Sequence, residues 1–379
     1  MSGARPLELR DVERGRKLRE RLARAVERAG REITVMHVCG SHEQAMARYG
    51  LRQSLPRALR VQMGPGCPVC VTDAPEIDAV ITLAEAGHLV LTYGDMLRVP
   101  GRAGSLDDAR AAGARVEVIY SATQALERAR ATRDPVIFFA TGFETTAVAT
   151  AAILLQAPPD NLFVYSAHKW VPAAMEVVAC SPGSRIEGYL AAGHAATITG
   201  YGVFEPFVAA HQRPVVVAGF EPLDILAGLV SLVDLVARGE PRVVNAFPRC
   251  VSREGNRRAL DALRRVFRAG DGEWRGIACV PGGELQLRDA YAAWDAMRRF
   301  EDLLERAPER AERVDARDCR CGAIMTGLAE PTDCAHFGVA CRPESPIGAC
   351  MVSSEGPCRI WLEHRVAPPR PAAHEGDAP

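Results

Sequence analysis

Half of the cysteines in this chain lie close together near its C-terminus. Six of the 12 fall within a forty-residue stretch, namely Cys319, Cys321, Cys334, Cys341, Cys350 and Cys358. This stretch is rich in Gly and Pro and shows neither helical nor strand periodicity, so it can bury little apolar surface. A bound metal can supply the order that such a segment lacks. We therefore predict a metal site here.

The spacing of these cysteines bears on which metal they bind. Thiolates are soft ligands that suit either zinc or an iron–sulfur cluster. Structural zinc sites are usually built from two short C-x2–4-C units, and no such unit occurs in this segment. Widely spaced single ligands favour an iron–sulfur cluster, with zinc or no metal as alternatives. The spacing does not determine which four of the six cysteines are ligands. His336 could replace one cysteine ligand.

Charge and hydropathy exclude some classes of function. The formal net charge is −1, which does not favour nucleic acid or an anionic membrane surface as a partner. The longest apolar stretch, residues 147–157, is too short to span a bilayer, and the N-terminus is charged and helix-like. We expect a cytoplasmic protein without membrane association. In that compartment clustered cysteines indicate metal or redox chemistry rather than structural disulfides.

The apolar pattern predicts an α/β protein. Short apolar runs alternate with helical segments, as in parallel sheets built from βαβ units. The expected strands are 33–38, 59–63, 88–92, 115–119, 135–140, 162–166, 196–199 and 215–218. Helices are expected at 8–30, 74–86, 106–112, 121–130, 144–156, 170–179, 204–211, 222–238, 253–267 and 289–306. We expect two α/β domains, 1–133 and 134–248, then a helical and metal-binding domain, 249–365, and a disordered tail, 366–379.

Cys39 lies where an expected strand passes into a helix. Backbone N–H groups and the positive end of the helix dipole meet at such a position. We expect a thiol there to have a lowered pKa and to act as a nucleophile or metal ligand. His42 and Glu43 are candidates for proton transfer. A buried structural cysteine is the alternative.

Cys67 and Cys70 form a C-x-x-C motif at a second strand end, after Gly64-Pro65-Gly66. Its two thiols can form a disulfide or share a metal ion. Because parallel strands end at the same edge of a sheet, we expect Cys39, Cys67 and Cys70 to converge there. Cys180, Cys250 and Cys279 lie outside every motif and are expected to be small apolar residues.

A third strand-to-helix junction carries Gly142-Phe143-Glu144-Thr145-Thr146. Thr145 and Thr146 could bind an anion at the start of the helix, although simple N-capping is an equal alternative. The segment is not a Walker A motif, because no Gly-Lys-Ser/Thr follows.

Together these motifs resemble the HypD family of nickel–iron hydrogenase maturation factors. The matching segments are residues 37–43, 64–70, 142–146 and 334–358, the last with Met351-Val352-Ser353-Ser354-Glu355-Gly356, and the resemblance covers about residues 10–365. It implies two Rossmann-like α/β domains plus a third, loop-rich and partly helical domain that carries a 4Fe-4S cluster. The family's cluster pattern falls on Cys319, Cys334, Cys341 and Cys358, which would leave Cys321 and Cys350 as non-ligands.

The resemblance also implies a function. Members of the family act with a small HypC-like partner as the scaffold on which the Fe(CN)2CO group is assembled, and a HypE-like partner delivers cyanide. Cys39 matches the iron-binding cysteine, and Cys67 and Cys70 match a redox dithiol beside that iron. A family segment centred on His194 departs from the expected pattern at Ala195 and Ala196, so His194 receives no assigned role.

Two other functions remain compatible with the local features. An iron–sulfur-dependent disulfide reductase would use the cluster to reduce Cys67–Cys70, but Cys39 would then have no function. A zinc-stabilised interaction protein would have no redox role.

Overall fold

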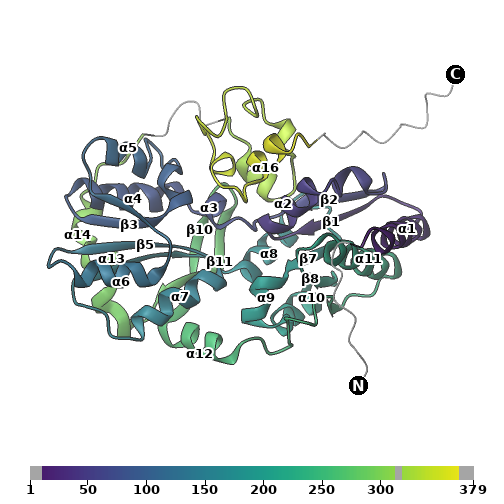
Figure 1. Cartoon of the computed structure of the whole chain (residues 1–379), viewed down its shortest axis with the longest axis horizontal. Helices are drawn as coiled ribbons and strands as arrows, with labels where there is room; N and C mark the ends of the chain where they lie inside the picture. Colours follow the sequence, from purple (N-terminus) through teal and green to yellow (C-terminus); the bar gives the residue numbers. More distant parts are fainter. Residues whose placement is uncertain (1–10, 312–317, 367–379) are drawn as a thin grey trace.

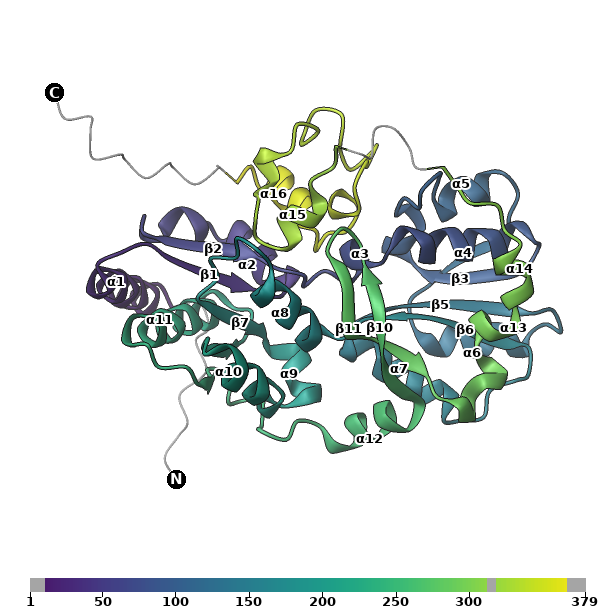
Figure 2. The same ribbon diagram turned by 180° about the vertical axis from the view of Figure 1, so that it is seen from behind.

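The computed structural model describes residues 11–311 and 318–366, which form two parallel β-sheets, a long β-hairpin and a cysteine-rich C-terminal segment (Figures 1 and 2). The predicted α/β class is confirmed. Residues 8–10 of the first expected helix, and the expected tail from residue 367 onward, lie outside the described residues. Within the described part of the chain, no helix combines the length and apolar character needed to cross a bilayer.

The first sheet has five parallel strands in the order β2-β1-β7-β8-β9. These are β1 Ile33–His37, β2 Leu59–Met63, β7 Gly188–Ala192, β8 Val215–Ala218 and β9 Val243–Asn245. Every residue of β1, β7 and β8 is buried, as expected for inner strands covered on both faces. The edge strand β2 instead alternates buried and half-buried residues.

The second sheet has four parallel strands in the order β4-β3-β5-β6. These are β3 Leu89–Tyr93, β4 Val116–Ile119, β5 Val136–Gly142 and β6 Leu162–His168. All seven residues of β5, Val-Ile-Phe-Phe-Ala-Thr-Gly, are buried. The strand therefore forms the centre of this half of the molecule.

Helices cover both sheets and connect their strands (Figure 1). The longer ones are α1 Val12–Ala29, α2 Gly40–Arg48, α4 Ala74–Glu85, α5 Leu106–Ala111, α6 Ala122–Arg130, α7 Glu144–Leu154, α8 Val171–Cys180, α9 Gly193–Thr199, α10 Glu205–His211, α11 Pro222–Arg238, α12 Arg257–Val266 and α16 Pro357–Glu363. Shorter helical turns are η1 Arg52–Ser54, α3 Pro68–Val71, η2 Gly94–Arg98, η3 Tyr201–Phe204, η4 Asp289–Trp294, α13 Ala296–Arg299, α14 Glu301–Glu305, α15 Cys321–Met325, η6 Pro331–Asp333 and η7 Ala349–Met351. One apolar core lies between the first sheet and the packed pair α1 and α11.

The two sheets do not follow the expected boundary between residues 133 and 134. β1 and β2 pair with β7 to β9, whereas β3 and β4, from the same expected domain, pair with β5 and β6. The chain thus leaves the first sheet after β2, builds the second sheet, and returns at β7. The sequence pattern predicts that strands exist but not which sheet each strand joins, because pairing depends on position in space.

One expected strand is a helix. Residues 196–199 belong to α9, and the strand of this region is β7, just before it. β7 has the sequence Gly-Tyr-Leu-Ala-Ala, with few of the branched or aromatic residues typical of strands. Gly188 is required at its start, because a Cβ there would lie 2.8 Å from the side chain of Leu232. Close packing against α11 favours small residues in β7, so its sequence lacks the pattern by which a strand is recognised.

The sequence pattern also missed a β-hairpin. The antiparallel strands β10 Phe267–Trp274 and β11 Ala278–Leu287 follow α12, where only helices were expected. Its glycines resemble a loop in the sequence, and its register shifts between Gly270 and Gly272. The expected helix 289–306 is divided into η4, α13 and α14.

A buried lysine joins the hairpin to the second sheet. The Nζ of Lys169, just after β6, is fully buried and pairs with Glu284 of β11 and with Glu76 of α4, the latter at 2.9 Å. It also donates to the carbonyl oxygen of Glu273 at 3.1 Å. This cation therefore connects three segments that are far apart in the sequence. Beyond the hairpin, the cysteine-rich segment lies over α2 and α3 (Figures 1 and 2).

Candidate functional site

Cys39 follows β1 and directly precedes α2, as the sequence predicted. Its side chain is almost fully buried, at 2% exposure. Two glycines allow the chain to close around it. A Cβ at Gly66 would lie 2.1 Å from the backbone nitrogen of Cys39, and one at Gly40 would lie 2.5 Å from the Cβ of Glu355. The segment before Cys67 and the C-terminal segment therefore both touch the Cys39 turn.

The expected lowering of the Cys39 pKa is wrong. Burial raises the pKa of this thiol to about 12, and the carboxyl group of Glu355 adds to the effect. The backbone N–H groups of His42 and Ser41 act in the opposite direction but do not compensate. Loss of hydration disfavours the charged form of a buried group more than one helix end stabilises it. Without a metal, Cys39 is a neutral thiol.

Glu43 lies at the centre of a buried polar network. Its Oε2 is 2.8 Å from His37 Nε2, and its Oε1 accepts from Arg52 Nε at 2.6 Å and from Trp361 Nε1 at 2.7 Å. Burial alone would raise the pKa of Glu43, but the Arg52 charge and the hydrogen bonds from His37 and Arg52 lower it below its usual range. Glu43 is therefore an ionised anchor whose two oxygens are both occupied.

His37 connects this network to Cys39. Its Nδ1 is 3.0 Å from the carbonyl oxygen of Cys39, while its Nε2 faces Glu43. Trp361 belongs to α16 in the C-terminal segment. The network thus links the Cys39 turn to the cysteine-rich segment.

His42 is buried in a different setting. Its Nε2 contacts the carbonyl oxygen of Gly219 at 3.0 Å, and its buried Nδ1 has no hydrogen-bond partner. Burial, followed by the nearby His37, lowers the pKa of His42 to about 3. His42 is thus a neutral imidazole with a free lone pair. Its ring and that of His194 both contact Phe220, so His194 lies in the same aromatic group, at the start of α9 rather than at a strand end.

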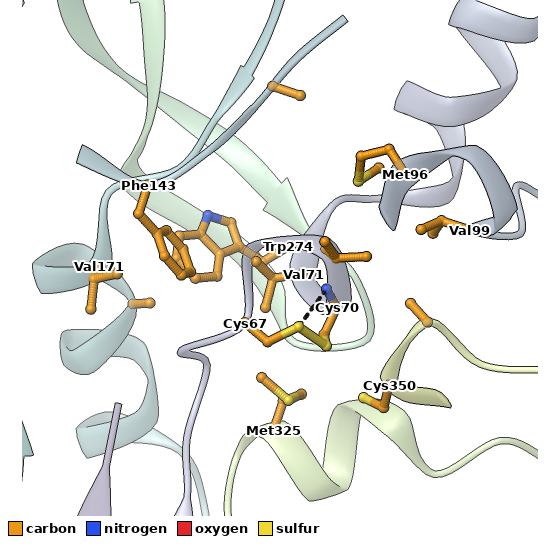
Figure 3. Packing of buried hydrophobic residues seen from close by; sticks show 14 of the residues in the cluster. Cys67, Cys70, Val71, Met96, Val99, Phe143, Val171, Trp274, Met325 and Cys350 are labelled. Atoms are coloured by element: carbon orange, nitrogen blue, oxygen red, sulfur yellow. Dashed lines mark hydrogen bonds between the residues drawn. A yellow bond between two sulfur atoms is a disulfide. The ribbon is translucent and has the colours of Figure 1, made fainter. Parts of the chain in front are cut away.

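Cys67 and Cys70 form a disulfide, with their Cα atoms 5.3 Å apart. Cys67 precedes α3 and its sulfur accepts from the backbone N–H of Cys70 at 3.2 Å. Both residues are fully buried. Figure 3 shows Trp274 and Phe143 on one side of the disulfide and Met325 and Cys350 on the other. The expected convergence of Cys39 with Cys67 and Cys70 is present as neighbouring turns of one sheet edge.

All six C-terminal cysteines line one small cavity, together with His336. Among residues 11–311 and 318–366, no three His, Cys, Asp or Glu side chains are arranged to hold a single metal ion. The cysteines instead surround the cavity, each from its own part of the loop. This donor set, soft and distributed around a space, fits a polynuclear iron–sulfur cluster in which each thiolate binds a different iron.

Burial does not separate the four expected ligands from Cys321 and Cys350. Cys350 is fully buried, and Cys321, at 8% exposure, is as buried as Cys334 and Cys358. The sulfur of Cys321 accepts from the backbone N–H of Cys350 at 3.3 Å. A hydrogen bond from Cys319, then one from Cys350, lowers the pKa of Cys321. Cys350 lines the cavity, and the turn that carries it, η7, packs against α3, which carries Cys70, an arrangement that the sequence position alone does not indicate.

The Gly142–Thr146 segment lies at the end of β5, as expected. Gly142 has φ +130°, and a Cβ there would lie 2.5 Å from the Cβ of Thr146. Phe143 stacks on Trp274 and so connects this turn to the disulfide. Glu144 is 1% exposed, one of its oxygens has no partner, and burial raises its pKa to about 7. Anion binding by Thr145 and Thr146 stays a prediction.

Several residues of the site were missed from the sequence. Trp274 and Arg275 come from the unexpected hairpin, and Trp361 lies in α16. Glu355 was visible only as part of a matching motif, and its Oε1 accepts from Ser41 Oγ at 2.9 Å. Cys180, Cys250 and Cys279 were expected to be buried, but all three are exposed. The general preference of cysteine for burial does not hold for these three residues, which lie at a helix end, in a loop and on the outer face of a strand.

The comparisons with known proteins agree with this geometry. The model of the HypD family, described as "Hydrogenase formation hypA family", matches residues 13–365. The chain is 41% identical over 370 residues to the hydrogenase expression/formation protein HupD of Azotobacter chroococcum, covering 94% of this chain and 96% of the relative. It is 40% identical to the hydrogenase maturation factors HypD of Azotobacter vinelandii and Cupriavidus necator. These matches cover 94% and 93% of this chain and 96% and 94% of the relatives.

The match extends over every element that carries the site, from β1 to α16. The motifs at Cys39, Cys67–Cys70 and the C-terminal cysteines therefore occur in the context in which the resemblance placed them. The chain belongs to the HypD family of hydrogenase maturation factors.

Proposed function

We propose that this protein is a scaffold on which the Fe(CN)2CO group of nickel–iron hydrogenases is assembled, together with a HypC-like partner and a HypE-like cyanide donor. The observation that carries the proposal is that three thiol sites, namely Cys39, the Cys67–Cys70 disulfide and the C-terminal cysteines, lie next to one another. The Cys39 turn touches Gly66, which precedes the Cys67–Cys70 disulfide, and Cys350 connects that disulfide to the cysteine-lined cavity. A redox input and an iron-binding thiol are thus within one buried region.

Cys319, Cys334, Cys341 and Cys358 would hold a 4Fe-4S cluster in this proposal. Such a cluster supplies electrons one at a time when bound. The disulfide of Cys67 and Cys70 can accept two electrons and two protons and open to two thiols. Because Cys67, Cys70, Cys321 and Cys350 are all buried, this part of the chain would also keep water away from the exchange.

Cys39 would bind the iron cargo, with the Cys67 and Cys70 thiols nearby as further candidate ligands. A thiol must lose its proton when it binds iron. His42, the expected acceptor for that proton, has an unpartnered buried Nδ1, but burial lowers its pKa to about 3, so it would be only a weak base in this position. Glu43 receives a different role from the expected one. Its occupied oxygens hold His37, Arg52 and Trp361 in place rather than move a proton.

A disulfide reductase acting on protein clients is the main alternative. The complete burial of Cys67 and Cys70 disfavours it, because a client thiol could not reach either sulfur without local opening. A zinc-stabilised interaction protein would leave the buried Cys39 and the disulfide without a use. We also propose a cytoplasmic location, where the free thiols of this chain would stay reduced.

Infrared spectroscopy tests the proposed function directly. The protein would be purified without oxygen together with its HypC-like partner, with a Cys39→Ser variant as the control. We expect stretching bands of iron-bound cyanide and CO in the native complex and their loss in the variant. Absence of these bands from a native complex that holds its cluster and partner would favour the disulfide-reductase alternative.

A further inference from the structure

The tip of the β10–β11 hairpin contacts both the segment that follows the disulfide and the cysteine-rich segment. β10 ends at Trp274 and β11 begins at Ala278, so Arg275 and Gly276 lie in the turn. Figure 2 shows this tip beside α3 and the C-terminal segment, and Figure 3 shows Trp274 next to Cys67 and Cys70. The hairpin therefore places a positively charged residue, Arg275, near the disulfide and the cysteine-rich segment, between which electrons would move in the proposed function.

Backbone carbonyl groups fix the position of Arg275. Its N–H donates to Val71 at 3.0 Å, its Nε donates to Thr72 at 2.8 Å, and its Nη2 donates to Pro100 at 2.6 Å. Val71 and Thr72 directly follow Cys70, so the guanidinium is tied to the helix that carries the disulfide. These acceptors are neutral, and they hold the group without cancelling its charge.

The other side of the hairpin tip touches the cysteine cavity. A Cβ on Gly322 would lie 1.8 Å from the carbonyl oxygen of Gly276, so the turn fits directly against the residue after Cys321. Burial lowers the pKa of the Arg275 guanidinium, and its electrostatic neighbours include Cys321, Cys350 and Cys319 as well as Asp73. The contact between Gly276 and Gly322 therefore brings this cation beside the cysteine-lined cavity.

We propose that Arg275 is a positioning residue that raises the reduction potential of the cluster held by the C-terminal cysteines. The inference rests on the cluster of the proposed function. Each added electron makes a thiolate-bound cluster more negative, and a fixed cation in a partly dry site stabilises that reduced form. Net charge and hydrogen bonding around the sulfurs are known determinants of such potentials.

A redox titration of the full-length protein under anaerobic conditions, followed by electron paramagnetic resonance, measures this effect. Arg275→Gln should lower the midpoint potential, making the ratio of reduced to oxidised cluster about tenfold smaller at a given potential, which corresponds to about 59 mV for one electron. Arg275→Lys keeps the charge and should restore most of the shift. Arg268→Gln removes an exposed arginine at the far end of the same hairpin and should leave the midpoint unchanged.

A fourth variant keeps the test decisive if Arg275→Gln fails to retain its cluster. Asp73 is the carboxylate that acts on Arg275, and Asp73→Asn keeps a good residue for the helix start of α4. This variant should raise the midpoint potential. Unchanged midpoints in cluster-loaded Arg275 and Asp73 variants would overturn the inference and leave the proposed function intact. A native protein that binds no cluster would overturn both.

Discussion

The Cys39 turn and the C-terminal cysteine segment are both buried, but the protein buries them by different means. Cys39 lies between a fully buried strand and a helix, beside a carboxylate whose oxygens are satisfied by His37, Arg52 and Trp361. The C-terminal cysteines lie within or between helices of three to seven residues. Their nearest polar partners are mainly one another.

This difference indicates how each region gains its stability. The Cys39 turn is organised by contacts within the protein and has its geometry without a metal. Short helices are marginal by themselves, and closely spaced buried thiols gain little unless a metal binds them. The C-terminal segment should therefore depend on the proposed cluster for its order, whereas the Cys39 turn should not depend on the proposed iron cargo.

Removal of the proposed cluster should have the largest of the expected effects, and it should affect the order of the C-terminal segment. If it does not, the two regions do not differ in the way that their contacts indicate. After oxidative removal of iron and chelation, we expect amide hydrogens of residues 318–366 to exchange at least about tenfold faster, while the buried inner strand β1 keeps its protection. Hydrogen exchange followed by mass spectrometry measures both regions in one sample. Unchanged protection of residues 318–366 in iron-free protein would show that protein contacts alone order the segment.

Glu43→Gln tests whether the buried ion network organises the Cys39 turn. The change leaves Arg52, which is 12% exposed, without its charge partner, and should lower the free energy of unfolding by about 3–5 kcal/mol. Glu363→Gln is the matched control, because Glu363 pairs with Arg359 at the surface of α16 and should matter by about 0.5 kcal/mol. Equal effects in chemical denaturation would remove the distinction between the two pairs.

Glu144 provides a buried carboxyl without an ion pair, in contrast to Glu43. Its pKa is raised from 4.5 to about 7 by burial. The folded state therefore binds more protons than the unfolded state between these values, and stability falls as pH rises through this window, by up to about 3 kcal/mol. Glu144→Gln should flatten the decline between pH 5 and pH 8, as followed by thermal unfolding. The exposed Glu127→Gln should not change it.

Replacing Ser41 should have the smallest effect on stability, and it tests the direct contact between the two regions. Its hydroxyl donates to Glu355 of the C-terminal segment at 2.9 Å. Ser41→Ala should cost about 1 kcal/mol of unfolding free energy, the usual value of one such hydrogen bond. In a double-mutant cycle with Glu355→Ala, which removes the acceptor, most of this cost should appear as coupling energy. Additive effects would show that the hydroxyl contributes only locally.

Much of the site was predictable because its chemistry is local in sequence. The strand-to-helix junctions at Cys39 and Gly142 and the C-x-x-C turn at Cys67 were identified from short patterns, and the structure has them at those positions. The cysteine-rich segment was visible from composition alone. Trp274 was not predictable, because the glycines of its hairpin resemble a loop and its partner Phe143 is more than a hundred residues away.

By itself the sequence determined the α/β class, the family and the presence of three cysteine sites, since periodicity and spacing follow from residues that are near one another in the chain. Only the tertiary structure decided that β1 and β2 join the sheet of β7 rather than that of β3, and that the hairpin turn with Arg275 and Gly276 packs against Gly322 beside the cavity. It also reversed the expected pKa shift of Cys39. Strand pairing, desolvation and electrostatic fields depend on distances through space, and these exist only once the chain has folded.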